Sequence, residues 1–232
     1  DFIIFKELYN TGIIILNRPE SLNALNLEMF ISLKKQLNLW KKNKQIKRVM
    51  IKGIGKSFCA GGDVKSIYYI NKDSKLREDF FKHEYSLNYI IKSFNKPYLA
   101  IWNGIVMGGG VGISVYGKYR IVTENAKLAM PESAIGFFPD VGTSYILSRM
   151  KNSLGLYLGL TGHVLNYYEI CKLSFANYFV SEKDLYAFEE NFIKHGSVEN
   201  KLTSELPILS SKIVNNQSLI NIHFSSMNIE TI

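Results

Sequence analysis

The sequence predicts an α/β fold with a helical C-terminal part. Short β-branched and aromatic runs alternate with segments in which apolar residues recur every three or four positions, a pattern typical of strands followed by packed helices. From Gly142 onward the strand-like runs give way to mostly helical sequence. The chain has 232 residues and is 47% hydrophobic, so it can bury one core of ordinary size.

The first fifty residues contain strand-like runs around one helix. We expect strands at Ile3–Phe5 and Gly12–Leu16, where β-branched residues dominate. A helix is predicted from about Asn26, because apolar residues recur there at helical spacing. These residues are Phe30, Leu33, Leu37 and Trp40. A short buried strand is expected at Arg48–Lys52.

A second helix carries the acid Glu84 beside an apolar stripe. The stripe consists of Phe80, Phe81, Leu87, Ile91 and Phe94. Lys96-Pro97 ends this helix, because the residue before a proline avoids helical geometry. Tyr98–Ile101 is then predicted as a buried strand.

Glycines divide the remainder of the chain. Gly104 turns the chain, and Gly109-Gly110 opens a helix that runs toward Tyr116. We expect strands at Tyr119–Val122 and Lys127–Ala129, then short helices, and a last strand at Phe179-Val180. The glycines that separate these helices are Gly155, Gly159 and Gly162.

Composition favours an anionic partner without naming it. The formal charge is +8 and the pI is near 9.3, but the lysines are scattered, so a phosphate-bearing small molecule fits at least as well as nucleic acid. Composition bias is an equally good explanation of the lysine excess. Cys59 and Cys171 form neither a Cys-x-x-Cys pair nor a zinc cluster, so we expect free thiols and no metal. The apolar stretch Leu99–Tyr116 is interrupted by glycines and is too short for a membrane span.

Two glycine clusters lie upstream of two acids. The clusters are Ala60-Gly61-Gly62 and Gly108-Gly109-Gly110, and the acids Glu132 and Asp140 each follow a proline. Glycines let backbone amides approach a ligand, and two such amides can hold one developing oxyanion. With carboxylates nearby, the pattern indicates chemistry at a carbonyl group.

Two other glycine motifs are excluded by counting. A phosphate loop ending in Gly55-Lys56-Ser57 needs a glycine five residues earlier, where Met50 stands. The dinucleotide fingerprint needs a third glycine where Phe58 and Ile113 stand. Neither nucleotide motif is therefore present.

Several motifs together resemble the crotonase (enoyl-CoA hydratase/isomerase) superfamily. The general ones are Leu16-Asn17-Arg18-Pro19, Phe58-Cys59-Ala60-Gly61-Gly62-Asp63 and Met107-Gly108-Gly109-Gly110. Within the superfamily the chain is most similar to the 3-hydroxyisobutyryl-CoA hydrolases. That similarity lies in Phe80-Phe81-x-x-Glu84-Tyr85, Ala129-Met130-Pro131-Glu132 and Phe138-Pro139-Asp140-Val141-Gly142, and it runs from about residue 5 to 185.

The resemblance implies a crotonase-like spiral of β-β-α units that holds a thioester oxygen between the backbone amides of Gly62 and Gly109. Glu132 and Asp140 would together cleave the thioester. Glu132 either activates water or attacks the thioester to give an anhydride, while Asp140 orients the water or shares its proton. Gly112 stands where hydratases of the superfamily carry a second carboxylate. The expected reaction is hydrolysis of 3-hydroxyisobutyryl-CoA or a similar short 3-hydroxyacyl-CoA to CoA and free acid, as in valine breakdown.

The other implied site residues carry alternatives. The resemblance places Glu84 against the substrate, at the acyl hydroxyl, and places Ala60, Gly61 and Lys65 at the CoA. Glu84 is equally well explained as a partly solvated acid, and Lys65 as a surface lysine. Pro131-Glu132 could simply begin a helix, and Pro139-Asp140 could form a turn.

The resemblance also sets expectations for organisation and partners. We expect a core with the acyl-CoA site at residues 1–185 and a short helical segment at 186–232, truncated relative to the family. We expect a homo-oligomer, trimer or hexamer, in the mitochondrion, with no cofactor beyond the substrate's CoA, no metal, no nucleic acid and no membrane. The alternatives are another crotonase-type reaction such as isomerisation, or a non-catalytic homologue serving as a structural subunit.

Overall fold

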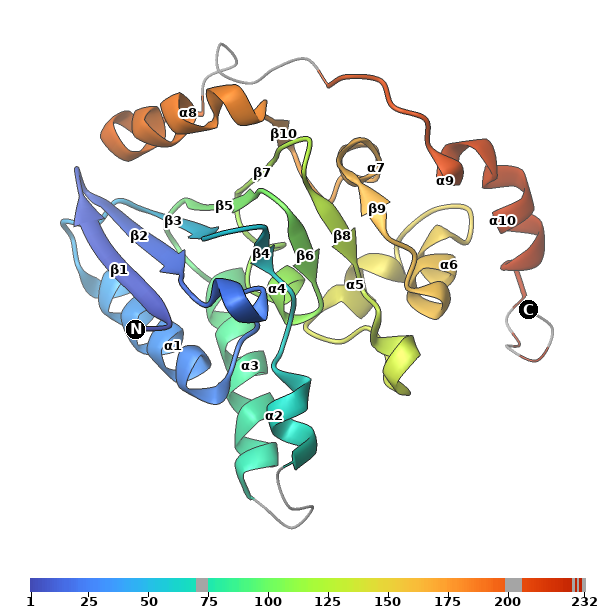
Figure 1. Cartoon of the computed structure of the whole chain (residues 1–232), viewed down its shortest axis with the longest axis horizontal. Coiled ribbons are helices and arrows are strands. Elements are labelled where there is room, and N and C mark those ends of the chain that lie inside the picture. Colours follow the sequence, from blue (N-terminus) through green and yellow to red (C-terminus); the bar gives the residue numbers. More distant parts are fainter. Residues whose placement is uncertain (70–74, 199–205, 227, 229, 231–232) are drawn as a thin grey trace.

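The computed structural model describes residues 1–69, 75–198 and 206–226, with 228 and 230. Its strands form two sheets, of order β1-β2-β3-β5-β7-β10 and β4-β6-β8-β9 (Figure 1). The pairs β1–β2 and β8–β9 are antiparallel, and the other pairs in the described residues are parallel.

The strands from β3 to β8 alternate between the two sheets. The larger sheet contains β1 (Ile3–Leu8), β2 (Thr11–Leu16), β3 (Arg48–Gly53), β5 (Tyr98–Trp102), β7 (Tyr119–Val122) and β10 (Tyr178–Phe179). The smaller sheet contains β4 (Ser57–Cys59), β6 (Ile105–Met107), β8 (Lys127–Ala129) and β9 (Leu165–Asn166). Each pair of strands is followed by helix, so the chain is a spiral of β-β-α units, as predicted.

Helices cover both faces of the larger sheet. Figure 1 shows α8 (Glu182–His195) on the opposite side of this sheet from α1 (Leu27–Lys42) and α3 (Lys75–Lys92). Successive strand residues point to opposite faces, so Ile13 and Met50 pack with Phe188 and Phe192 of α8, while their neighbours enter the core on the α1 side. The predicted start of α1 is confirmed, because Asn26 accepts a capping hydrogen bond from the Met29 amide at 2.9 Å.

Short helices make up the remainder. They are η1 (Pro19–Ser21), α2 (Val64–Tyr69), α4 (Gly109–Gly112), η2 (Glu132–Ile135), α5 (Thr143–Leu147), α6 (Leu154–Thr161), α7 (Tyr167–Lys172), α9 (Lys212–Asn215) and α10 (Gln217–His223). The helix predicted to run toward Tyr116 ends at Gly112 and continues as turns, in which the Ser114 hydroxyl donates to the Gly110 carbonyl at 2.6 Å. None of the helices in the described residues is both long and apolar enough to cross a membrane.

Candidate active site

Three neighbouring strands of the smaller sheet deliver the site. β4, β6 and β8 are parallel and adjacent, so their carboxyl ends lie at one edge of that sheet. The glycine turn at 60–62 follows β4, the Gly108 turn follows β6, and Glu132 follows β8. Parallel sheets place ligands beyond the carboxyl ends of their strands. The topology therefore brings both glycine clusters and one acid to the same place.

A cavity of about 460 Å³ opens at this edge. All of the predicted site residues except Lys65 line it. Its remaining wall is largely apolar and includes Ile67, Phe80, Phe81, Ile135 and Phe137. Three acids share the cavity, and none of the described residues that line it is Lys, Arg or His.

The two glycine clusters are direct neighbours at the cavity. A Cβ atom placed on Gly109 would be 3.1 Å from the Gly62 amide nitrogen and 2.6 Å from Oε1 of Glu84. Gly110 must be glycine for a related reason, because its Cβ would lie 2.4 Å from the Cys59 carbonyl oxygen. Gly108 has φ +48°, a backbone conformation that favours glycine.

The Gly62 amide is left available by the pairing of its turn. Leu25 bonds to the residues on either side of Gly62: its N–H donates to Gly61 and its carbonyl accepts from Asp63. In such a parallel bridge the intervening amide points away from its partner strand. Gly109 is the first residue of α4, so its amide has no acceptor within the helix. The site thus has two backbone donors beside one cavity.

Glu84 occupies the buried face of α3 and is 3% exposed. Burial, followed by repulsion from Asp140 and Glu132, raises its pKa to about 8. Glu84 therefore lies inside the cavity and is not the partly solvated helix acid that the sequence also allowed. Its contact with an acyl hydroxyl stays a prediction.

Glu132 is 8% exposed, and it both begins η2 and lines the cavity. Beginning a helix and lying in the site are therefore not alternatives for this residue. Oε1 lies 2.9 Å from the position of a Cβ on Gly108, and Oε2 has no hydrogen-bond partner in the described structure. Burial is the main cause of a rise in its pKa to about 7, opposed by its own backbone N–H and aided by Asp140. Near neutral pH this carboxyl can both hold and release a proton.

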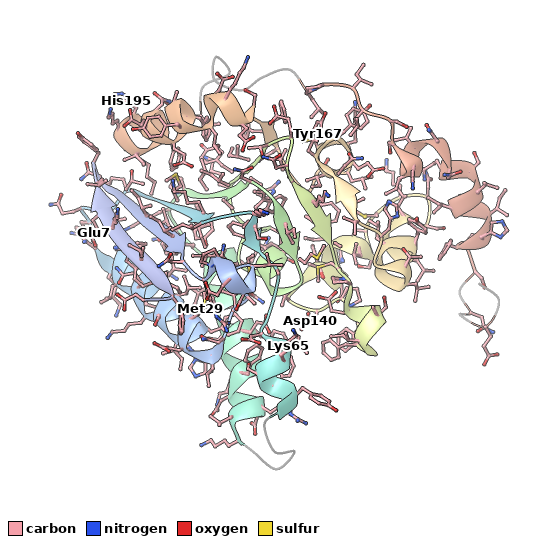
Figure 2. The ribbon with its side chains drawn as sticks, viewed as in Figure 1. Glu7, Met29, Lys65, Asp140, Tyr167 and His195 are labelled. Atoms are coloured by element: carbon pink, nitrogen blue, oxygen red, sulfur yellow. The ribbon has the colours of Figure 1, made fainter. Side chains whose placement is uncertain are left out.

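Asp140 has a partner that the sequence did not assign. The Tyr85 hydroxyl donates to Oδ2 of Asp140 at 2.7 Å. Burial raises the pKa of Asp140, whereas this hydrogen bond lowers it. Tyr85 follows Glu84 in the motif Phe80-Phe81-x-x-Glu84-Tyr85, but the motif alone does not indicate that Tyr85 contacts Asp140. The contact depends on the direction in which α3 presents Tyr85, toward the loop before α5. Figure 2 labels Asp140 in that loop.

Gly112 is packed against the same loop. A Cβ at this position would lie 2.6 Å from Cβ of Val141 and 3.1 Å from Nδ2 of Asn88. Val141 is 3% exposed, so the space where a side chain of residue 112 would project is already filled. Position 112 therefore lacks the second carboxylate, and the packing of Val141 leaves no room for one.

Two basic residues near the Gly62 turn lie outside the cavity. Lys65 is exposed near the start of α2, where Figure 2 labels it, and its role at the CoA stays a prediction. Arg18 forms an ion pair with Asp63, from its guanidinium to Oδ2 at 2.7 Å, so it fastens the turn that carries Gly62. Among the described residues no group of three His, Cys, Asp or Glu side chains could hold a metal ion.

The fold and this site define an enoyl-CoA hydratase/isomerase, or crotonase, protein. The family model described as enoyl-CoA hydratase/isomerase matches residues 11–232, and the chain belongs to that family. A solved carnitinyl-CoA dehydratase from Mycobacterium thermoresistibile superposes with a TM-score of 0.93 at 33% identity, covering 100% of this chain and 68% of that one.

More specific similarity is to 3-hydroxyisobutyryl-CoA hydrolases. The mitochondrial protein of that name from Xenopus tropicalis is 47% identical over 184 residues, which are 78% of this chain and 48% of that protein. The Homo sapiens protein is 45% identical over 194 residues, which are 82% of this chain and 50% of that protein. The chain thus spans about half the length of these curated relatives.

Proposed function

We propose that the chain hydrolyses the thioester of 3-hydroxyisobutyryl-CoA or of a similar short 3-hydroxyacyl-CoA. The observation that carries this proposal is the single cavity shared by Glu132, Asp140 and the Gly62 and Gly109 turns. The names of the relatives at 47% and 45% identity support the same substrate.

In the proposed reaction the Gly62 and Gly109 amides donate to the thioester oxygen as it becomes negative. One such donor is typically worth about 3 kcal/mol of barrier. Glu132 supplies the reacting oxygen or activates it, and Asp140 holds water or a proton nearby. As the C–S bond breaks, CoA leaves as a thiolate that takes up a proton, and the acyl group ends as a free carboxylic acid.

Two routes fit this arrangement and leave different isotopic products. If Glu132 activates water, a single turnover in H₂¹⁸O puts the label in the released acid. If Glu132 attacks first, an acyl–Glu132 anhydride forms, and water that cleaves it at the Glu132 carbonyl leaves the label in the protein. Mass spectrometry of the acid and of the peptide that contains Glu132 measures both.

Hydration and isomerisation are the competing reactions within the family. Hydratases of the superfamily pair the acid at Glu132 with a second carboxylate at the position of Gly112, and here Val141 fills that space. Isomerisation would use Glu132 and Asp140 to move a proton, without cleaving the thioester. The alternative of a non-catalytic structural subunit, for instance of a mitochondrial ribosome, predicts stable ribonucleoprotein association and no turnover.

Thiol release from a panel of acyl-CoAs tests the proposal. We expect free CoA from 3-hydroxyisobutyryl-CoA, retained after dialysis against EDTA because the proposed chemistry needs only water and the substrate. Glu132→Gln should abolish release while acyl-CoA binding, measured by calorimetry, persists. Double-bond migration without free CoA, or an unchanged rate in Glu132→Gln, would refute the proposal.

The compartment is proposed from the same relatives, and the assembly from the resemblance to the superfamily. The proteins from Xenopus tropicalis and Homo sapiens are named mitochondrial, and we propose the same compartment for this chain. We also propose a homo-oligomer, which sedimentation of the purified chain would measure.

A further inference from the structure

Glu84 lies close to the two glycines that carry the proposed oxyanion donors. Its Oε1 is 2.6 Å from the position of a Cβ on Gly109 and 3.9 Å from that of a Cβ on Gly62. The first of these positions is also 3.1 Å from the Gly62 amide nitrogen. The Glu84 carboxyl and the Gly62 amide therefore both lie next to Gly109, whose amide is the other proposed donor.

The charged groups that act on Glu84 are both acids. Glu132 faces it from η2 and Asp140 faces it from the loop before α5. The titratable neighbours are Cys59 at the end of β4 and Tyr85 on α3, and burial raises the pKa of both, so both are neutral at pH 7. From α1, Phe30 packs against Phe80 of α3 through an edge-to-face ring contact. No described neighbour supplies a cation to balance an ionised Glu84.

An ionised Glu84 would oppose the reaction proposed above. A carboxylate bordering the region where the thioester oxygen becomes negative would repel it, and the repulsion is strong where water is excluded. A neutral carboxyl group has the opposite effect, because its O–H is a hydrogen-bond donor. At this position a protonated Glu84 favours the proposed reaction and an ionised Glu84 opposes it.

We propose that Glu84 acts as a neutral carboxylic acid and is a third hydrogen-bond donor, beside the Gly62 and Gly109 amides, to the thioester oxygen. This inference rests on the proposed hydrolase function and assigns Glu84 to the thioester oxygen instead of the acyl hydroxyl. The direction of its pKa, raised by burial and by Asp140 and Glu132 to about 8, agrees with it. Because the donor is lost on ionisation, the rate falls as pH rises through that value.

The variants Glu84→Gln and Glu84→Ala separate a neutral donor from a necessary carboxylate. Glutamine keeps a donor that does not ionise, so we expect kcat/KM within about threefold of wild type at pH 7 and no fall on the alkaline side. Alanine removes the donor and should cost about 100-fold, the typical loss for one oxyanion donor. Glu78→Gln makes the same chemical change at an exposed acid on α3 and should leave the pH profile unchanged.

Two further measurements test the position and the protonation of Glu84. Isobutyryl-CoA lacks the 3-hydroxyl, and Glu84→Ala should lose the same factor with it as with 3-hydroxyisobutyryl-CoA. An infrared difference between wild type and Glu84→Gln should show a protonated carboxyl band at pH 7 that disappears by pH 10.

The outcomes distinguish the inference from the function on which it rests. If wild type releases CoA but Glu84→Gln is as slow as Glu84→Ala, the inference is overturned and the hydrolase function stands. A loss confined to the hydroxylated substrate, or an ionised Glu84 at pH 7, also overturns the inference alone. Wild type that releases no CoA from any acyl-CoA overturns the proposed function, and the inference with it.

Discussion

Replacing Glu132 by glutamine should inactivate the protein and stabilise it. Glu132 is 8% exposed and its Oε2 lacks a hydrogen-bond partner in the described structure, so ionisation inside the cavity is unfavourable. Its pKa rises from 4.5 to about 7, chiefly through burial. At about 1.4 kcal/mol for each pKa unit, this rise removes about 3 kcal/mol from the folding free energy once the group is ionised in both states.

The pH window follows from the same two values. Below pH 4.5 the carboxyl is protonated in both the folded and the unfolded chain, so it has no effect on stability. Between pH 4.5 and about 7 the unfolded chain releases the proton while the folded chain retains it, and stability falls as pH rises. Glutamine has no proton to release. The advantage of Glu132→Gln therefore grows through this window and is constant above it.

Urea unfolding at pH 5 and pH 8, with thiol release on the same samples, checks the prediction. The variant should lie within about 1 kcal/mol of wild type at pH 5 and be about 2 to 3 kcal/mol more stable at pH 8. Its hydrolysis should fall at least 100-fold, roughly the contribution of a positioned acid or base. Glu78→Gln, at an exposed site, should change neither quantity. A variant that is inactive but less stable at pH 8 would refute the reasoning, because Glu132 would then be a structural hydrogen-bonding partner.

Three other perturbations test the remaining parts of the site. Tyr85→Phe removes the donor that lowers the pKa of Asp140, so the acid side of the pH–rate profile should move to higher pH, with about a tenfold loss of kcat. Tyr89→Phe, on the same helix, should leave the profile unchanged. An unchanged profile in Tyr85→Phe would contradict the role of Tyr85. Gly112→Glu should displace Val141 and lower the free energy of unfolding by about 1 to 3 kcal/mol. It should not create enoyl-CoA hydratase activity, which an absorbance assay for the conjugated double bond measures. Acyl-CoAs with a terminal carboxylate should react at least tenfold more slowly than neutral ones of similar size, because Glu132 and Asp140 line the cavity and none of its described lining residues is a cation. Equal kcat/KM values would exclude this electrostatic selection.

Much of the architecture could be predicted from periodicity. The strands near 12–16 and 48–52 and the helix that begins after Asn26 are long enough for their apolar spacing to be unambiguous. β4 and β6 have three residues each and adjoin glycine turns, and they were missed. The helix that ends at Gly112 was predicted too long, because its tight packing against β4 and Val141 depends on contacts that are distant in sequence.

The site was predictable in its parts, while its arrangement depended on topology. Residue types and family motifs pointed to Gly62, Gly109, Glu132 and Asp140, but nothing local in the sequence indicates that β4, β6 and β8 are neighbours. The hydrogen bond from Tyr85 to Asp140 joins residues 55 positions apart, and such a contact leaves no periodic trace. The same holds for the ion pair between Arg18 and Asp63, which supports the Gly62 turn.

Charge is distributed unevenly between the surface and the cavity. The chain as a whole has a formal charge of +8, yet Glu84, Glu132 and Asp140 line the cavity and no basic residue is among the described residues of its lining. An acyl-CoA has its negative charges on the nucleotide and none at a simple thioester. The net positive charge of the chain therefore attracts the nucleotide, while the acidic cavity favours the uncharged acyl thioester. Burial is the main cause of the raised pKa values of Glu84 and Glu132, and repulsion from the neighbouring acids adds to it. These values make both carboxyls able to exchange protons near neutral pH.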